Sequence, residues 1–168
     1  PNKSMMSLLC VDPAKDYIAA VPRILQPCCE TLAAERVRFC GGIGLKAQSA
    51  VPRPGRHRPL IYVTLGTTYF SDAPVFFRSC IEAFRHLDLD VILAVWKYVD
   101  VRQLGEAPEN IDIRISVDQT DVLRQCDAAL FIGGINTVKD CLMLGVPMVI
   151  CPFFYDNYAT AKLIGEAG

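Results

Sequence analysis

The sequence predicts a doubly wound α/β fold, Rossmann-like, in which helices cover both faces of a parallel sheet. From residue 60 onward, short apolar runs such as LIYVTLG at 60–66 and VILAV at 91–95 alternate with segments of helical periodicity. Nearly continuous apolar runs are typical of strands that are buried on both faces of a parallel sheet. Strands that alternate with helices favour right-handed crossovers between parallel neighbours.

The elements of this sheet are expected in a regular order after the strand at 60–66. Ser71 or Asp72 can cap a first helix that Pro74 helps to start, and Phe77 lies on its apolar face. Further strands are expected at 91–95, 111–117, 128–132 and 147–151. Helices are expected at 121–125, at 136–144 and from about residue 158.

The first 58 residues differ from the rest in pattern. They contain one short strand at 36–40, stopped by glycines, and then the proline-rich and basic stretch KAQSAVPRPGRHRP. We interpret this stretch as a solvated linker rather than a phosphate-binding patch. The chain therefore divides into residues 1–58, which end in a linker, and a domain at 59–168.

Composition limits the classes of function. The chain has 168 residues, 52% of them hydrophobic, and can bury one sizeable core. Its 17 basic and 18 acidic residues indicate neither a nucleic-acid nor a membrane-surface partner, and no apolar run is long enough to span a membrane. The 8 cysteines include no Cys-x-x-Cys pair, which favours reduced core thiols and a cytoplasmic location over a zinc site or a disulfide scaffold.

The glycine pair after the strand at 128–132 is the first candidate site. Ligands of such sheets bind beyond the carboxyl ends of the strands. Gly133 and Gly134 allow backbone to approach a ligand closely and to adopt positive φ. Asn136 and Thr137, which open the next helix, can cap it or donate to an anionic oxygen. A tight turn followed by an ordinary cap remains the alternative.

Three acidic or amide side chains extend this candidate site. Asp140 lies one turn beyond Asn136 on the same helix face and can accept hydrogen bonds from ribose hydroxyls, or it is a surface acid. Asp156 and Asn157 suit sugar hydroxyls or cap the last helix. The hydroxyl groups of Thr67 and Thr68 either stabilise a turn or donate hydrogen bonds to a phosphate.

Several motifs in this order resemble a known family. They are RVRFCGG at 36–42, the strand followed by Gly-Thr, VDQTDVL, and CDAALFIGGINTVKDCLMLGVPMVICPFFYDN. Together they resemble the C-terminal, donor-binding half of a GT-B fold glycosyltransferase of the UDP-glycosyltransferase and macrolide glycosyltransferase group. The likeness covers residues 60–168.

The resemblance implies a role for each matching residue. Gly66 and Thr67 would lie near the diphosphate and the donor sugar, and the segment from Ser116 through Val117 to Gln119 would border the nucleobase. The diphosphate would be held by the segment after Ile132: Gly133, Gly134, Asn136 and Thr137. Asp140 would bind the ribose, and Asp156 with Asn157 the sugar. The donor, a UDP- or dTDP-sugar, would be a substrate, with no cofactor and no metal.

The chain also departs from the family pattern. Ile132 replaces a histidine that donates to phosphate, Ser116 replaces the base-stacking tryptophan, and Asp118 replaces a proline. Asp140 and Asn157 stand in place of a glutamate and a glutamine. Loss of one charge-assisted phosphate contact costs ~1.5–3 kcal/mol.

The resemblance implies inverting transfer of a hexosyl group to a hydroxyl of a small-molecule acceptor. The general base and the acceptor site would belong to an N-terminal half, and closing helices would follow residue 168, so this segment alone is expected to be inactive. A catalytically degenerate nucleotide-binding or interaction module, and a donor-binding subunit with a separate acceptor-binding partner, are the alternatives. Donor sugar, base, acceptor and oligomeric state do not follow from the sequence.

Overall fold

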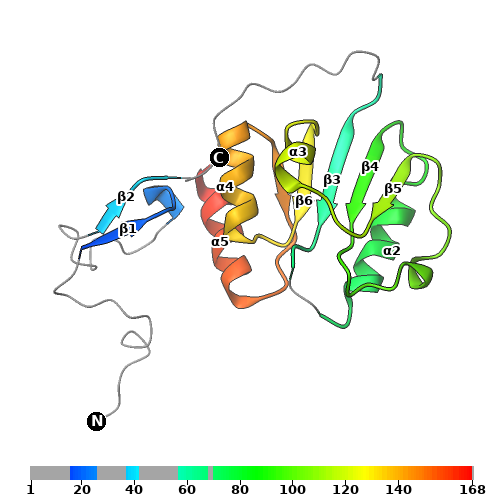
Figure 1. Ribbon diagram of the computed structural model, residues 1–168, viewed down its shortest axis with the longest axis horizontal. Coiled ribbons are helices and arrows are strands. Elements are labelled where there is room, and N and C mark those ends of the chain that lie inside the picture. The colour runs from blue at the N-terminus through cyan, green and yellow to red at the C-terminus, as the bar shows by residue number, and fades with distance from the viewer. Residues whose placement is uncertain (1–15, 26–36, 42–56, 68–69, 168) are drawn as a thin grey trace, which may run out of the picture.

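A five-stranded parallel sheet forms the centre of the computed structural model, which describes residues 16–25, 37–41, 57–67 and 70–167 (Figure 1). Its strands are β3 (Leu60–Thr64), β4 (Asp90–Ala94), β5 (Ile111–Arg114), β6 (Ala128–Phe131) and β7 (Met148–Ile150). They lie in the order β5-β4-β3-β6-β7, and every neighbouring pair is parallel. The predicted α/β fold is confirmed.

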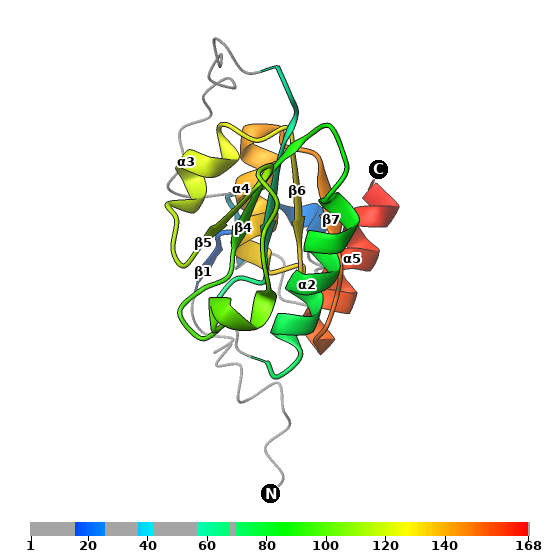
Figure 2. The same cartoon turned by 90° about the vertical axis from the view of Figure 1, so that its right-hand side faces the viewer.

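Helices cover both faces of the sheet (Figure 2). One face carries α2 (Ala73–Phe84) and the 3-10 helix η2 (Val101–Leu104). The other carries α3 (Gln119–Leu123) and α4 (Ile135–Leu144), and two apolar residues of α5 (Tyr155–Ala167), Leu163 and Ile164, pack on the same side. Helices α2 and α4 turn apolar residues such as Phe77 and Val138 inward, as their periodicity predicts.

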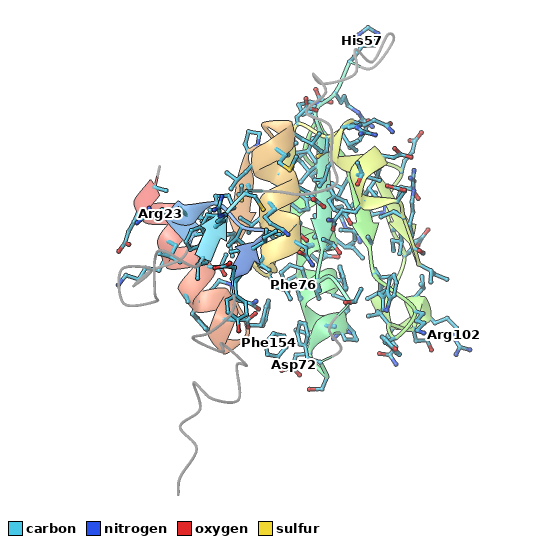
Figure 3. All side chains as sticks on the ribbon, turned by 60° about the vertical axis from the view of Figure 1, so that its left-hand side comes forward. Arg23, His57, Asp72, Phe76, Arg102 and Phe154 are labelled. Carbon is cyan, nitrogen blue, oxygen red and sulfur yellow. The ribbon has the colours of Figure 1, made fainter. Side chains whose placement is uncertain are left out.

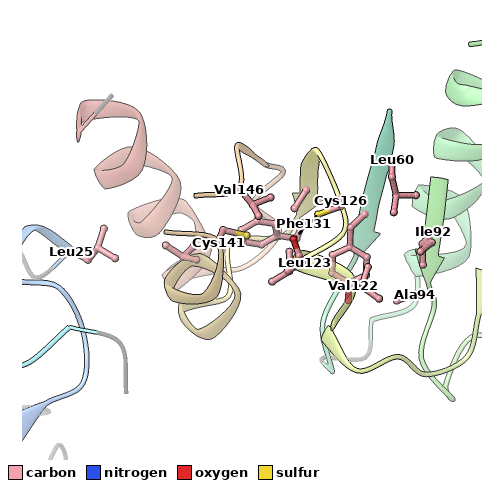
Figure 4. Packing of buried hydrophobic residues seen from close by; sticks show 13 residues of the cluster. Leu25, Leu60, Ile92, Ala94, Val122, Leu123, Cys126, Phe131, Cys141 and Val146 are labelled. Atoms are coloured by element: carbon pink, nitrogen blue, oxygen red, sulfur yellow. Dashed lines mark hydrogen bonds between the residues drawn. The ribbon is translucent and has the colours of Figure 1, made fainter. Parts of the chain in front are cut away.

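Alternation along β3 separates the core into two clusters. The Val63 side chain packs with Phe77 and Ile81 of α2, whereas that of Tyr62 packs with Leu123 and other residues on the α3 and α4 side. All five are at most 2% exposed. Figure 4 shows the second cluster, with Leu123 labelled. Burial of one such aliphatic or aromatic side chain contributes about 1.5–3 kcal/mol, so these clusters fix the helices against the sheet.

A two-stranded sheet precedes the main one. The strand predicted at 36–40 is confirmed as β2 (Val37–Phe39), which pairs in parallel with β1 (Tyr17–Ala19). The sequence analysis did not predict β1. The short helix η1 (Arg23–Leu25) follows β1, and its Leu25 is buried in the cluster on the α4 side.

Most of the predicted linker lies within residues 42–56, outside the described residues, so the linker stays a prediction. The exposed Arg58 donates to a carboxylate oxygen of Asp90 at 2.6 Å. This end of the stretch is therefore tied to the first residue of β4.

One predicted strand ends earlier than expected, and one predicted helix begins earlier than expected. The strand expected at 111–117 stops at Arg114, because its neighbour β4 stops at Ala94, which pairs with Arg114. The last helix begins at Tyr155 rather than near 158, since the backbone N–H groups of Asn157 and Tyr158 both donate to the Phe154 carbonyl. The structure thus moves Asp156 and Asn157 from a loop into the first turn of α5.

Helix capping also differs from the prediction. Asp72 occupies the N-cap position of α2 but makes no capping hydrogen bond with its side chain. Helix α4 begins at Ile135 with Gly134 as its N-cap, so Asn136 is not a cap. Helix α3 begins at Gln119, two residues earlier than predicted, because Asp118 Oδ1 caps it by accepting from the Asp121 N–H at 3.1 Å.

Three of the described cysteines lie in the core, as the sequence predicts. Cys80, Cys126 and Cys141 are buried, whereas Cys151 is half-buried and Cys40 is exposed. Burial raises the pKa of the Cys80 and Cys141 thiols to about 12. In the described part of the chain, no helix combines the length and apolar character needed to cross a membrane.

Candidate functional site

The carboxyl ends of the parallel strands form one rim of the molecule, at the bottom of Figure 1. Helices α4 and α5 begin at the same rim, directly after β6 and β7. Most of the predicted site residues lie in these loops and first turns. Polar loops and helix N-termini therefore meet at the edge where such sheets bind ligands.

A cavity of about 250 Å³ opens at this rim, and we call it the strand-end cavity. Five predicted site residues line it, which places Gly66 and Thr67 after β3 beside the segment after β5. The described lining residues are Tyr62, Thr64, Gly66, Thr67, Ala94, Trp96, Ile115, Ser116, Val117 and Gln119. Ligand pockets for whole drug-sized molecules occupy about 300–1,000 Å³, so this volume suits part of a ligand.

Trp96 was not among the predicted site residues, although it follows the end of β4. Its φ of 61° is the only positive φ of a non-glycine residue in the described part of the chain. For a bulky residue this backbone conformation costs about 1–2 kcal/mol. Tyr62, Thr64 and Ala94 were also missed, because only the fold brings their strands together at the cavity.

The turn after β6, which we call the glycine turn (Gly133 and Gly134), owes its shape to one of its glycines. Gly133 is buried with φ 98°, and a Cβ there would lie 2.8 Å from Ile150 Cγ2 and 3.3 Å from the Asn157 carbonyl oxygen. Gly134 has an ordinary φ of −59° and open space around it. The sequence prediction treated the two alike. The structure shows that only Gly133 needs positive φ and close packing.

Asn157 packs beside the glycine turn from the first turn of α5. Its side chain is 3% exposed, and its Oδ1 is a buried acceptor without a hydrogen-bond partner. Among the described residues, one other buried side-chain polar atom lacks a partner, the donor Nε of Arg124. An unpaired buried polar atom costs about 1–3 kcal/mol, so Asn157 Oδ1 is an acceptor available to a ligand or a water molecule.

Gln119 connects the strand-end cavity with the start of α4. Its Oε1 accepts from Thr137 Oγ1 at 3.2 Å, and its Nε2 donates to Asp140 Oδ2 at 2.8 Å. Thr137 lies in the first turn of α4 and is buried. The structure thus brings Gln119, Thr137 and Asp140 together, as the sequence predicts for a shared site, and holds the Asp140 carboxylate in place.

Aromatic side chains close the rim on the α2 side. The Phe70 ring lies 4.9 Å from that of Phe153 and 5.5 Å from that of Phe154, and Phe76 lies 5.7 Å from Phe153. Figure 3 shows Phe76 and Phe154 at the same end of the molecule as Asp72. These ring contacts join the loop after β3 to the loop before α5. Asp156 and Asn157 follow in the first turn of α5.

Eight of the predicted site residues that the structure describes do not line the strand-end cavity, among them Ile132, Asn136 and Asp156. The Ile132 side chain is 5% exposed and belongs to the apolar cluster beneath α2, so it is a core residue. Asn136 and Asp156 are exposed in the first turns of α4 and α5. Thr68 lies outside the described residues.

The described lining of the strand-end cavity includes one titratable side chain, Tyr62. Burial raises the pKa of its phenol to about 12, partly offset by a hydrogen bond with Thr64. At neutral pH the phenol is protonated and cannot act as a general base. The cavity is therefore suited to binding by hydrogen bonds and apolar contact rather than to proton transfer.

The fold and the rim define a Rossmann-like α/β domain with a ligand site at its strand ends. A sequence model described as UDP-glucoronosyl and UDP-glucosyl transferase matches residues 58–168. The chain belongs to this family of glycosyltransferases.

Individual relatives agree with this assignment. The chain is 34% identical over 161 residues to the NDP-glycosyltransferase YjiC of Bacillus licheniformis, covering 94% of this chain and 40% of the relative. It is 36% identical over 148 residues to the demethyllactenocin mycarosyltransferase of Streptomyces fradiae, covering 87% and 32%. The crystal structure of the glycotransferase of kitacinnamycin matches with a TM-score of 0.76 and 32% identity, covering 91% of this chain and 40% of that one. The first three curated relatives are matched over 28–40% of their length.

Proposed function

We propose that residues 59–168 bind the nucleotide-diphosphate sugar of a glycosyltransferase, with residues 1–58 belonging to a preceding half and the linker. The observation that carries this proposal is the connection through Gln119 between the strand-end cavity and the start of α4. One ligand can reach both, with a base in the cavity and a diphosphate at the helix start. The UDP in the family description and the NDP in the name of its Bacillus relative agree with this class of ligand.

The diphosphate would lie at the glycine turn and the first turn of α4. The first intrahelical bond runs from the Val138 N–H to the Gly134 carbonyl at 3.1 Å, so three preceding N–H groups point out of the helix end. These N–H groups and the positive end of the helix dipole favour an anion. Gly134 adds no side chain that would keep a phosphate away.

The ribose would be bound by Asp140 and the sugar by residues of α5. Gln119 Nε2 occupies one oxygen of Asp140, which leaves the other carboxylate oxygen to accept from ribose hydroxyl groups. Asn157 Oδ1 is the buried acceptor beside the glycine turn, and Asp156 is exposed one residue before it. These roles place the sugar between α4 and α5.

The reaction would be an inverting transfer to a hydroxyl group of a small-molecule acceptor. The acceptor oxygen attacks the anomeric carbon, the bond from that carbon to the diphosphate oxygen breaks, and the nucleoside diphosphate leaves with the electron pair. The acceptor proton passes to a base, which the family resemblance assigns to the acceptor-binding half. The helix end stabilises the charge that develops on the leaving diphosphate.

The donor would be a UDP- or dTDP-sugar acting as substrate without a resident cofactor or metal, and the protein would work in the cytoplasm. Whether the acceptor-binding half lies on the same chain or on a partner subunit is decided by the full reading frame.

Calorimetric titration of the 168-residue chain with UDP, dTDP and UDP-glucose tests the proposal. We expect saturable binding of at least one nucleotide with a Kd between micromolar and millimolar. Adenosine, which lacks a diphosphate, should bind more weakly and serves as the control. Absence of binding by all three ligands at millimolar concentration would disprove the donor site.

A further inference from the structure

The backbone at Trp96 is held in a conformation that bulky residues avoid. Its φ is 61°, and the turn is closed on both sides by hydrogen bonds. The Val95 N–H donates to the Arg114 carbonyl at 2.9 Å, and the Val99 N–H donates to the Trp96 carbonyl at 3.3 Å. Strained residues of this kind persist where the surrounding structure determines them, and they cluster at ligand sites.

The same residue borders two cavities. It lines the strand-end cavity, and it also lines a much smaller cavity of about 10 Å³ whose wall includes Leu65, Phe77 and Val99. These three residues belong to the core beneath α2. Trp96 thus has rigid core on one side and an open cavity on the other.

The lining of the strand-end cavity suits a flat heterocycle. Trp96 and Tyr62 are its aromatic residues among the described ones, and Tyr62 is only 2% exposed, which leaves Trp96 as the ring at the surface. Ile115 and Val117 add apolar contact, while Ser116 and Thr67 add hydroxyl groups. Ring faces prefer aromatic or apolar surfaces, and ring edges prefer hydrogen-bonding groups.

We propose that Trp96 is a ligand-binding residue whose indole ring stacks on the nucleobase, and that the positive φ holds the ring in this position. The inference rests on the proposed function. Ser116, which lines the same cavity from the loop after β5, has no ring to offer. The base would therefore be recognised from the loop after β4.

The chain contains 1 tryptophan, so its fluorescence reports on Trp96 alone. The 168-residue chain is titrated with UDP and with dTDP while tryptophan fluorescence is followed, and the same titrations are repeated by calorimetry. We expect fluorescence quenching that saturates with the calorimetric Kd. Inorganic pyrophosphate, which has no base, should leave the fluorescence unchanged. Calorimetric binding of both nucleotides without a fluorescence change would overturn the role of Trp96 and leave the donor site standing.

Two variants provide an independent readout. Trp96→Gly removes the ring, and glycine adopts positive φ without strain, so circular dichroism should show a folded protein. Trp96→Phe keeps an aromatic ring. Stacking on one aromatic ring is worth roughly a 5- to 100-fold change in affinity.

We therefore expect Trp96→Gly to weaken UDP binding about tenfold or more, Trp96→Phe to weaken it less than about threefold, and pyrophosphate affinity to stay the same in both. Unchanged UDP affinity in Trp96→Gly would refute the stacking role. Absence of any nucleotide binding by the unaltered chain would refute the donor site and the stacking role together.

Discussion

The glycine turn and the strand-end cavity differ in packing density: the turn is tightly packed, and the cavity is open. At the glycine turn the neighbours are tight, since Gly133 has no room for a Cβ and both Asn157 and Thr137 are buried. At the strand-end cavity Thr67 and Ser116 are exposed and surround open space. Steric fit therefore determines which residues the glycine turn accepts at Gly133, whereas folding leaves the exposed residues of the cavity wall free to vary. Changes at Gly133 should alter stability first, and changes at the exposed Thr67 and Ser116 should alter binding alone.

Gly133→Ala should have the largest effect. The added Cβ meets Ile150 Cγ2 at 2.8 Å, and alanine must adopt a φ of 98°. A strained backbone of this kind costs about 1–3 kcal/mol, and the overlap adds to it, so we expect a loss of about 3 kcal/mol or more in the free energy of unfolding. Urea denaturation followed by circular dichroism measures this loss.

Gly134→Ala is the matched control at the same turn. Its φ of −59° suits alanine and nothing lies within 4 Å of the added Cβ. The loss should stay below about 1 kcal/mol, the usual cost of alanine at an N-cap. Equal losses in the two variants would contradict the steric account of the turn.

Gln119→Ala tests the connection between the two regions. It removes the hydrogen bonds to Thr137 and Asp140, both partly buried, and should lower the free energy of unfolding by about 1–2 kcal/mol. Gln125→Ala, which removes one exposed hydrogen bond to the Asp121 carbonyl, should cost less than about 0.5 kcal/mol. Thermal or urea unfolding measures the loss in the free energy of unfolding for both variants. Similar losses would mean that the Gln119 hydrogen bonds to Thr137 and Asp140 do not stabilise the fold.

Asn157→Leu asks whether the buried acceptor serves stability or binding. Since Oδ1 has no hydrogen-bond partner among the described residues, removal of the amide should leave the free energy of unfolding unchanged or raise it by up to about 1 kcal/mol. Affinity for a sugar nucleotide should fall at the same time, measured by calorimetry against the nucleoside diphosphate. A stability loss above about 2 kcal/mol would show that the side chain is already satisfied within the fold.

Ser116→Trp should have the smallest effect and should act on binding alone. Ser116 is exposed at the strand-end cavity, so a larger side chain fits without disturbing the core. A second aromatic ring beside the base would add about 1 kcal/mol, roughly a fivefold gain in UDP affinity with unchanged unfolding. A large stability loss would show that this wall is as constrained as the glycine turn.

Sequence reasoning located most of the loops and helix starts at the rim because it relied on strand ends. The apolar runs at 60–66 and 128–132 identified the strands, and the rule that ligands bind beyond their carboxyl ends identified the loops. It misplaced Asp156 and Asn157 because polar residues of this kind suggest a turn, whereas the Phe154 carbonyl already accepts the first N–H bonds of α5. It placed Trp96 at a strand end but gave it no role in the site, because no local pattern reveals a positive φ in a bulky residue.

The sequence by itself determined the doubly wound sheet, the position of the glycine turn and the family, because apolar periodicity and short motifs are local properties of the chain. Only the tertiary structure decided that Gly133 rather than Gly134 is sterically required, that Ile132 is a core residue and that Trp96 borders the cavity. Each of these depends on atoms distant in the sequence, such as Ile150 against Gly133. Close packing makes such contacts specific, and spacing along the chain does not encode them.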